Sequence, residues 1–146
     1  MDITLRKAQT SDIDFLILLR DATMRPYLED VGMPTTREDY IKRIEYEFDH
    51  ARIIECDGTA AGLFKAAFIH ELNQWYIFQI QVHPQYQNQT IGRQLIQSLI
   101  DQARLSGADV GLSVIKTNPA QKLYVSLGFE CISETNEEYN MMLKTG

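Results

Sequence analysis

Hydrophobic and polar residues alternate with two different periods along this chain, and each change of period marks a new element. Residues 3–8 (ITLRKA) alternate every second position, as in a strand. Thr10 or Ser11 then offers a side-chain oxygen that can cap a helix over residues 13–30. Pro26 lies inside that helical pattern and is expected to bend or end the helix.

A second helix and a hairpin are predicted next. Residues 34–48 contain an N-cap candidate, an acidic first turn and apolar residues at helical spacing, namely Ile41, Ile44 and Phe48. Two β-forming runs within residues 51–71 flank Asp57-Gly58, a pair that tolerates positive φ and is typical of a tight hairpin. Residues 73–84 are dense in aromatic and β-branched residues, which predicts a central strand ending at Pro84.

The C-terminal half continues the alternation of helix and strand. A polar loop leads into a helix that closes at Gly107 and carries one apolar stripe: Leu95, Ile96, Leu99, Ile100 and Ala103. Residues 109–115 predict a strand. A second helical stripe then precedes Gly128: Ala120, Leu123, Tyr124 and Leu127. Residues 129–134 and 138–144 can form a final hairpin.

The predicted order is β-α-α-β-β-β-α-β-α-β-β, which indicates an α/β fold with a mixed sheet. A chain of 146 residues has the usual size of one domain, so residues 1–146 are expected to form a single domain. The sequence contains no linker, internal repeat or low-complexity segment that would divide it.

The composition of the chain argues against two classes of binding partner, nucleic acids and membranes. The chain has 14 Lys and Arg against 20 Asp and Glu, a formal net charge of −6, which argues against binding to a nucleic-acid backbone. No apolar run approaches the ~18 residues of a membrane helix, and the N-terminal residues lack the pattern of a secretory signal. Cys56 and Cys131 are far apart and have no CxxC spacing. We therefore expect a cytoplasmic protein without a membrane partner.

The polar loop of residues 83–92 (HPQYQNQTIG) is the first candidate for chemistry. A strand followed by such a loop and a helix directs backbone N–H groups and the positive helix end toward an anion such as a pyrophosphate, although a plain strand-to-helix turn has the same pattern. Three common signatures, GxGxxG, GxxxxGK[ST] and GxSxG, are absent. His50, His70 and His83 lack the spacing of metal ligands, so no metal site is expected.

Two segments, VHPQYQNQTIGRQLI and NPAQKLYVSLGF, taken together resemble the GNAT superfamily of acyl-CoA-dependent N-acetyltransferases. In VHPQYQNQTIGRQLI, the family's loop motif Q/R-x-x-G-x-G/A is matched by Gln87, Thr90 and Gly92. In NPAQKLYVSLGF, a second family motif is matched by Asn118, Leu123, Tyr124, Gly128 and Phe129. The order of elements also fits, so the resemblance covers nearly the whole chain. It implies a central mixed sheet with helices on both faces.

The resemblance also implies roles for individual residues. Ile80, Gln81 and Val82 would pair with the pantetheine arm of acetyl-CoA, and the Val82 N–H would polarise the thioester carbonyl. The pyrophosphate would be held by the N–H groups of Gln87, Asn88, Gln89, Thr90, Ile91, Gly92 and Arg93.

Two further residues keep both a functional and a structural interpretation. Asn118 would contact the pantetheine arm, cap the following helix, or do both. Tyr124 would protonate the leaving thiolate, but its place on an apolar stripe also fits a tyrosine of the core.

The sequence departs from the family at two points. Thr90 stands where the family has a glycine, so its side chain either crowds the phosphate or offers it a hydroxyl. Gln79 and Gln81 stand on the strand where many relatives carry a glutamate as general base, and an amide cannot take up a proton. The base would then be His70, Glu71 or a more distant carboxylate, or the amine would arrive neutral.

The resemblance therefore implies an acetyl-CoA-dependent N-acetyltransferase. A primary amine of a small molecule or a peptide would attack the thioester directly in a ternary complex, without a metal, and a homodimer is one expected assembly. The alternative of the same fold is a catalytically weak module that binds or senses acyl-CoA. An α/β interaction domain that binds no CoA is a second alternative. The identity of the amine acceptor is not encoded in any motif that we recognise.

Overall fold

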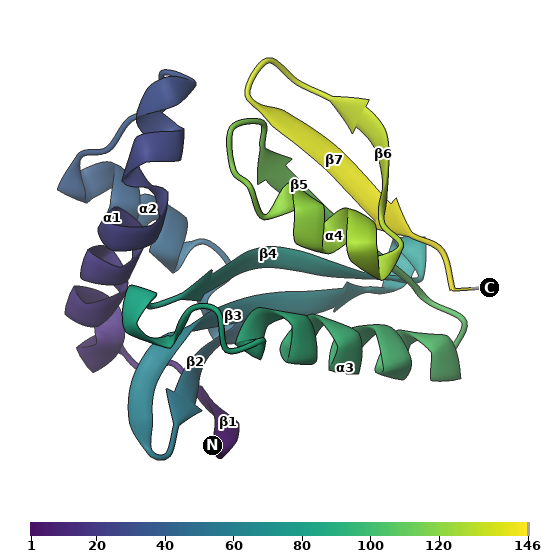
Figure 1. Ribbon diagram of the computed structural model, residues 1–146, viewed down its shortest axis with the longest axis horizontal. Coiled ribbons are helices and arrows are strands. Elements are labelled where there is room, and N and C mark those ends of the chain that lie inside the picture. The colour runs from purple at the N-terminus through teal and green to yellow at the C-terminus, as the bar shows by residue number, and fades with distance from the viewer. Residues whose placement is uncertain (146) are drawn as a thin grey trace. The chain divides into compact units, whose positions relative to one another are not determined.

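A computed structural model describes residues 1–145 and has the element order that the sequence predicts. The strands are β1 (Ile3–Lys7), β2 (Ala51–Cys56), β3 (Thr59–Ile69), β4 (Gln74–Val82), β5 (Asp109–Ile115), β6 (Glu130–Glu134) and β7 (Glu138–Leu143). The α-helices are α1 (Ile13–Asp30), α2 (Arg37–Glu45), α3 (Ile91–Leu105) and α4 (Gln121–Leu127) (Figure 1).

The seven strands form one mixed sheet in the order β1-β2-β3-β4-β5-β7-β6. The pairs β1–β2, β2–β3, β5–β7 and β6–β7 are antiparallel, whereas β4 and β5 are parallel. A parallel pair needs a crossover connection, and here α3 lies between β4 and β5 in the chain. The predicted mixed sheet and the central position of β4 are confirmed.

The chain forms two compact units, of which the first contains Met1–Lys65 and Gln79–Gly92. Its hairpin of β2 and β3 turns at Asp57 and Gly58, whose φ values of 51° and 83° are those of the predicted tight turn. The core of this unit is formed by side chains with at most 1% exposure, including Leu16, Leu19, Ile53, Ile54 and Leu63.

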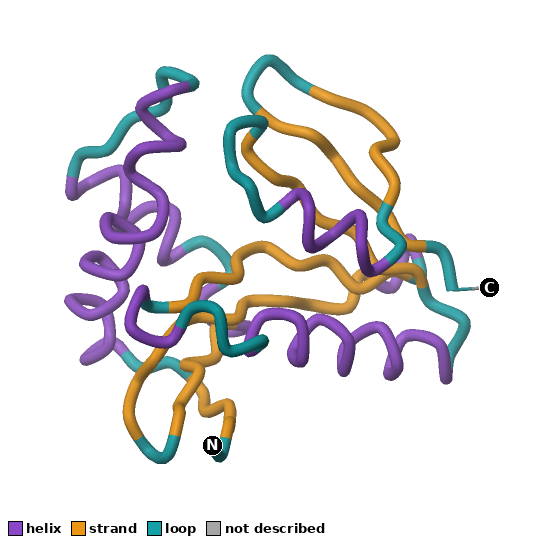
Figure 2. Tube along the Cα trace, in the orientation of Figure 1, coloured by secondary structure: helices purple, strands orange, loops and turns teal. Residues whose placement is uncertain are grey.

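The second unit contains Ala66–Phe78 and the chain from Arg93 onward. Its C-terminal hairpin, β6 and β7, lies beside β5, as Figures 1 and 2 show. The apolar stripe of α3 is buried as predicted, at Ile96, Leu99, Ile100 and Ala103. Gly107 follows the end of this helix with φ at 66°, and its N–H donates to the carbonyl of Arg104.

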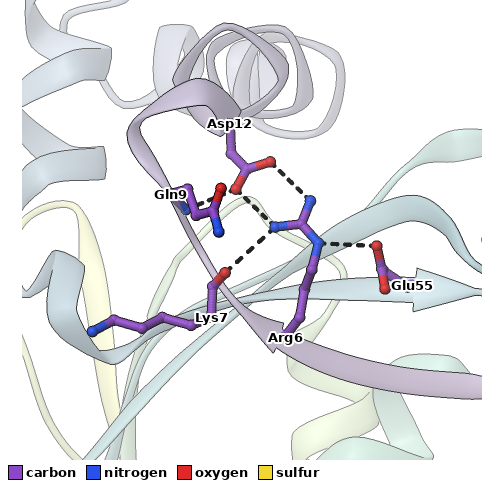
Figure 3. Close-up of polar contacts among 5 residues, drawn as sticks. All are labelled: Arg6, Lys7, Gln9, Asp12 and Glu55. Carbon is purple, nitrogen blue, oxygen red and sulfur yellow. Dashed lines mark hydrogen bonds and ion pairs between the residues drawn. The ribbon is translucent and has the colours of Figure 1, made fainter.

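The start of α1 differs from the prediction. Neither Thr10 nor Ser11 caps the helix, because a short 3-10 turn at Thr10–Asp12 precedes it. Asp12 instead accepts the Gln9 N–H at 2.7 Å and two bonds from the Arg6 guanidinium at 2.9 Å (Figure 3). Arg6 also donates to Glu55 at 2.9 Å, so one guanidinium ties β1 to both β2 and the entry of α1.

The other helix boundaries have local causes. Pro26 does not end α1, which runs on to Asp30. Thr36 is the N-cap of α2, since its hydroxyl oxygen accepts the Asp39 N–H at 3.2 Å, in agreement with the predicted cap in this segment. Over residues 1–145, no helix is both long and apolar enough to span a bilayer.

Candidate functional site

The C-terminal end of β4 leaves the regular ladder of the sheet. Pairing of β4 with β5 runs from Gln74 to Ile77 on β4, but β4 itself continues to Val82. On the β3 side, the register shift against β2 makes Ala61 an extra residue of β3, which is a β-bulge. The carbonyl of Ala61 accepts the His83 N–H at 2.7 Å. The bulge therefore fixes the C-terminal end of β4 through this hydrogen bond.

Gly62 follows the bulged residue, and a side chain cannot be accommodated there. A Cβ atom on Gly62 would overlap the Gln81 carbonyl oxygen and lie 3.2 Å from the Val82 Cα. The absence of a side chain at Gly62 thus allows the backbone of β4 to approach β3 closely. Sequence analysis did not select Gly62, although a glycine inside a strand pattern is the signal that could have found it.

The loop after β4 is fixed by bonds to its own strand. A 3-10 turn at Pro84–Tyr86 begins after His83, whose Nδ1 accepts the Gln85 N–H at 3.1 Å. The Gln87 side-chain amide donates to the Val82 carbonyl at 2.9 Å. Gln87, the first residue of the loop motif, therefore closes the loop onto the strand end.

The second half of the loop has an unusual backbone. Asn88 and Thr90 have φ values of 64° and 63°, whereas Gln89 between them does not have positive φ. Thr90 precedes the first residue of α3, and its hydroxyl donates to the Gln89 carbonyl at 2.6 Å. Residues with positive φ are frequent in the backbone concavities that bind anions, and α3 begins directly after these two with the N–H groups of its first turn.

Gln79 and Gln81 contribute buried polar groups to the same end of β4. Their side chains are 6% and 5% exposed, and alternation along the strand places both on one face. Within the described residues, both polar atoms of the Gln79 amide and the amide oxygen of Gln81 have no hydrogen-bond partner. Such groups are rare in protein interiors because each leaves a desolvation cost uncompensated. Neither side chain can act as a base.

Asn118 and Tyr124 lie in the second unit, at and after the start of α4. The Asn118 side-chain oxygen accepts the Ala120 N–H at 2.9 Å and so fixes the turn before α4, whose own N-cap residue is Ala120. Tyr124 is 6% exposed, and its ring packs against Phe129 with centroids 6.0 Å apart. Burial raises the pKa of the Tyr124 phenol to about 12, so its hydroxyl is protonated at neutral pH.

The two units divide the predicted site residues between them. The first unit brings together Ile80, Gln81, Val82 and the loop from Gln87 to Gly92. Arg93, Asn118 and Tyr124 belong to the second unit, where Arg93 donates to the Ser126 hydroxyl at 2.8 Å. The role predicted for each of these residues therefore stays a prediction.

The candidate bases His70 and Glu71 are also in the second unit, in an exposed 3-10 turn after β3. The His70 ring packs edge-on against Phe68, 4.8 Å between centroids. Neither His70 nor Glu71 has a hydrogen bond or ion pair to another described side chain that would support its assignment as a base.

A chain of polar side chains crosses four strands of the second unit and was not anticipated. The Tyr76 and Ser113 hydroxyls are 2.6 Å apart, Ser113 donates to Asn140 at 2.7 Å, and the Asn140 amide donates to Ser133 at 2.9 Å. The four residues come from four different strands, so the chain becomes visible only when the strand order β4-β5-β7-β6 is known. Among residues 1–145, no cluster of three or more His, Cys, Asp and Glu side chains could hold a metal ion.

Comparison with known proteins gives one family match. The model of a family described as the acetyltransferase (GNAT) family matches residues 16–129. No curated protein matches this sequence.

Solved structures share the fold at low sequence identity. An acetyltransferase from Thermus thermophilus superposes with a TM-score of 0.76 and 18% identity over 99% of this chain and 97% of that chain. The PaiA N-acetyltransferase of Thermoplasma acidophilum, in complex with coenzyme A, superposes with a TM-score of 0.73 and 18% identity over 99% of both chains. The ribosomal-protein-S18-alanine N-acetyltransferase of Escherichia coli superposes with a TM-score of 0.69 and 21% identity, over 99% of this chain and 95% of that chain.

Proposed function

This chain belongs to the GNAT family of acetyltransferases, and we propose on that basis that it transfers the acetyl group of acetyl-CoA to a primary amine of a small molecule or peptide. The amine attacks the thioester directly in a ternary complex, so no covalent enzyme intermediate forms. Acetyl-CoA supplies the activated acyl group, and the protein supplies binding, orientation and electrostatic stabilisation.

The conformation of the loop before α3 is the observation that carries this proposal. Asn88 and Thr90 have positive φ directly before the first turn of a 15-residue helix, where backbone N–H groups and the positive helix end favour an anion. A pyrophosphate is the group that such a concavity suits. Gln87 supports the loop from behind through its bond to the Val82 carbonyl. The residues present therefore fit the phosphates of coenzyme A.

The end of β4 supports the remaining part of the cofactor assignment. Its residues after Ile77 lie outside the ladder with β5, so an extended pantetheine arm can pair with the backbone from Ile80 to Val82 as an added strand would. The Val82 N–H then donates to the thioester carbonyl and stabilises the negative charge that develops on its oxygen.

Proton transfer in this proposal needs an acid but no side-chain base on β4. Tyr124, with a pKa of about 12, remains protonated over the physiological range and donates its proton to the departing thiolate. The proton that the attacking nitrogen loses restores the Tyr124 phenol, so no proton is gained or lost by the protein. Because the amides of Gln79 and Gln81 cannot accept a proton, the amine binds in its neutral form. Turnover therefore rises with pH toward the pKa of the acceptor amine. A plateau near pH 6 to 7 that is lost in His70→Ala would instead assign the base to that histidine.

The direct experiment follows the release of free CoA thiol when the protein is mixed with acetyl-CoA and a panel of polyamines, amino acids, aminoglycosides and peptide N-termini. Thiol release that depends on one class of amine supports the proposal. Saturable acetyl-CoA binding without thiol release for any amine would assign the chain to the alternative of a binding module. A thermal-shift measurement with CoA supplies the binding control, since a ligand at ~100 times its Kd adds about 2.7 kcal/mol of stability.

Tyr124→Phe tests the proposed acid without removing the ring from the core. We expect turnover to fall by roughly 10² to 10⁴ with little change in acetyl-CoA affinity, because a positioned general acid acts mainly in the transition state. Tyr139→Phe, a half-buried tyrosine of β7, is the matched control. A folded Tyr124→Phe variant with near-full turnover, when chemistry limits the rate, would leave Tyr124 as a core residue only.

A further inference from the structure

The first compact unit contains a pocket whose lining includes none of the residues assigned above to acetyl transfer. It encloses about 330 Å³ between α1, the connection after α1, and α2, and we call it the α1–α2 pocket. A volume of this size is in the range of pockets that hold small molecules. Most of its lining is apolar or aromatic, and its charged side chains are Arg20, Asp39, Lys42 and Arg43.

The lining has the opposite charge to the chain as a whole. The chain has a formal net charge of −6, whereas the pocket is lined by three cations and one carboxylate. That carboxylate, Asp39, accepts a hydrogen bond from the Thr36 hydroxyl at 2.5 Å within the N-cap of α2. An excess of positive charge in the lining favours an anionic ligand.

Two of the cations are oriented by aromatic rings that also line the pocket. The Arg20 guanidinium lies 5.7 Å from the centre of the Tyr40 ring, and Arg20 is only 8% exposed. The Arg43 guanidinium lies 5.9 Å from the centre of the Tyr46 ring. A guanidinium held over a ring keeps its N–H edge in a defined direction, and that edge matches the planar geometry of a carboxylate.

A buried lysine fixes the backbone of the pocket wall. Lys65 of β3 is 0% exposed, and its ammonium donates to the carbonyls of Arg43 at 3.1 Å, Ile44 at 3.0 Å and Tyr46 at 2.5 Å. These carbonyls belong to the last turn of α2 and its C-cap residue, where a positive charge is favourable. Because Arg43 and Tyr46 line the pocket, the same bonds hold its wall in place before a ligand arrives.

We propose that the α1–α2 pocket binds a small organic carboxylate with an apolar or aromatic body. The guanidinium groups of Arg20 and Arg43 and the ammonium of Lys42 hold the carboxylate, and the apolar lining buries the body of the ligand. The ligand is either a carboxylate-bearing amine that serves as acceptor or a separate carboxylic acid that binds beside it.

The test is calorimetric titration of the protein with 3-phenylpropionate as a probe. Its neutral amide, 3-phenylpropionamide, is the matched control ligand, and inorganic phosphate tests whether any anion suffices. We expect saturable binding of the acid, and affinity at least about tenfold weaker for the amide and for phosphate, since a charge-assisted bond is worth more than a neutral one.

Arg43→Gln and Arg37→Gln form a matched pair of variants. Each removes one positive charge from α2, but Arg37 does not line the pocket and instead lies 3.2 Å from Asp14. We expect Arg43→Gln to weaken binding of the probe by about tenfold or more and Arg37→Gln to leave it within about twofold. No saturable binding by the native chain, equal affinity for acid and amide, tighter binding of phosphate, or equal losses in the two variants would each overturn the proposal.

A kinetic measurement identifies the source of the carboxylate, and only this part rests on the proposed acetyltransferase activity. For a carboxylate-bearing acceptor, Arg43→Gln raises KM for amines with a carboxylate and leaves KM unchanged for amines without one. For a separate ligand, 3-phenylpropionate binds equally well with and without saturating amine. Calorimetry needs no turnover, so failure of the proposed function and failure of this pocket are distinguished.

Discussion

At the scale of single residues, Thr90 departs from the loop motif and has a left-handed backbone conformation. The family has a glycine at this position, and Thr90 has a φ of 63°, in the left-handed region that glycine enters without cost. For a β-branched residue this conformation is a genuine outlier, and the Cβ costs roughly 1–2 kcal/mol there. Thr90 therefore holds a backbone conformation that a glycine would adopt at lower cost.

Thr90→Gly and Thr90→Ala separate the effect of the Cβ from that of the hydroxyl. Both variants lack the hydroxyl, but only alanine keeps the strained Cβ, so we expect Thr90→Gly to be about 1 kcal/mol more stable than Thr90→Ala by urea unfolding. Affinity of Thr90→Gly for CoA should stay within about tenfold of the native chain. A much larger loss in both variants would mean that the hydroxyl is a ligand of the phosphate.

Gln79 is a residue that lowers the stability of the folded chain. Its amide is buried and both of its polar atoms lack partners among the described residues. Gln79→Met keeps the length of the side chain and removes that desolvation cost, so we expect a gain of about 1–3 kcal/mol in the free energy of unfolding. Gln97→Met on α3, where the amide already bonds Asp101 at 2.9 Å, is the control and should show no gain. A gain accompanied by lost turnover would indicate that the amide serves the reaction.

At the scale of elements, the bulge of β3 positions the end of β4, and Gly62→Ala tests this. Its Cβ would collide with the backbone of Gln81, which cannot move without displacing β4, so we expect a loss of roughly 1–3 kcal/mol and weaker CoA binding. Gly111→Ala on β5 is the matched control, because its Cβ would lie 2.5 Å from the Gln74 Nε2, the end of a flexible side chain. Equal losses in the two variants would contradict a special role for the bulge.

At the scale of the whole molecule, Lys65 links stability to pH. Burial, with smaller contributions from Arg43 and Arg20, lowers the pKa of Lys65 to about 7, whereas three carbonyl acceptors match an ammonium and oppose the shift. In the unfolded chain the pKa of a lysine is ~10.4, so between these values the unfolded state binds more protons and the free energy of unfolding rises with pH.

We therefore expect the stability of the native chain, relative to Lys65→Met, to increase between about pH 7 and pH 10, by at most ~1.4 kcal/mol per pH unit. Methionine does not titrate, so the difference isolates the lysine from other groups. Urea unfolding of both proteins across this range provides the measurement. A flat difference would mean that the carbonyls of α2 hold Lys65 as an ammonium throughout.

The sequence by itself determined the elements and their order. Helices α2 and α3, the turn at Asp57-Gly58 and the strand ending before Pro84 follow from hydrophobic period, capping residues and backbone preferences, all of which act over a few neighbouring residues. The motif residues of the loop and of α4 likewise pointed to the family that the full comparison shows. Local signals failed at the start of α1, because the Arg6 and Asp12 pair that sets it also involves Glu55 on another strand.

Only the tertiary structure decided which polar residues are buried and which backbones approach each other. Three features depend on contacts between elements distant in sequence: the buried amide atoms of Gln79 and Gln81 that lack partners among residues 1–145, the close approach at Gly62, and Lys65 held by carbonyls at the end of α2. The hydrophobic periodicity of a segment cannot encode such contacts, because the same pattern of residues is compatible with many ways of packing the elements. The pocket of Arg20 and Arg43 appears for the same reason only when α1 and α2 are placed side by side.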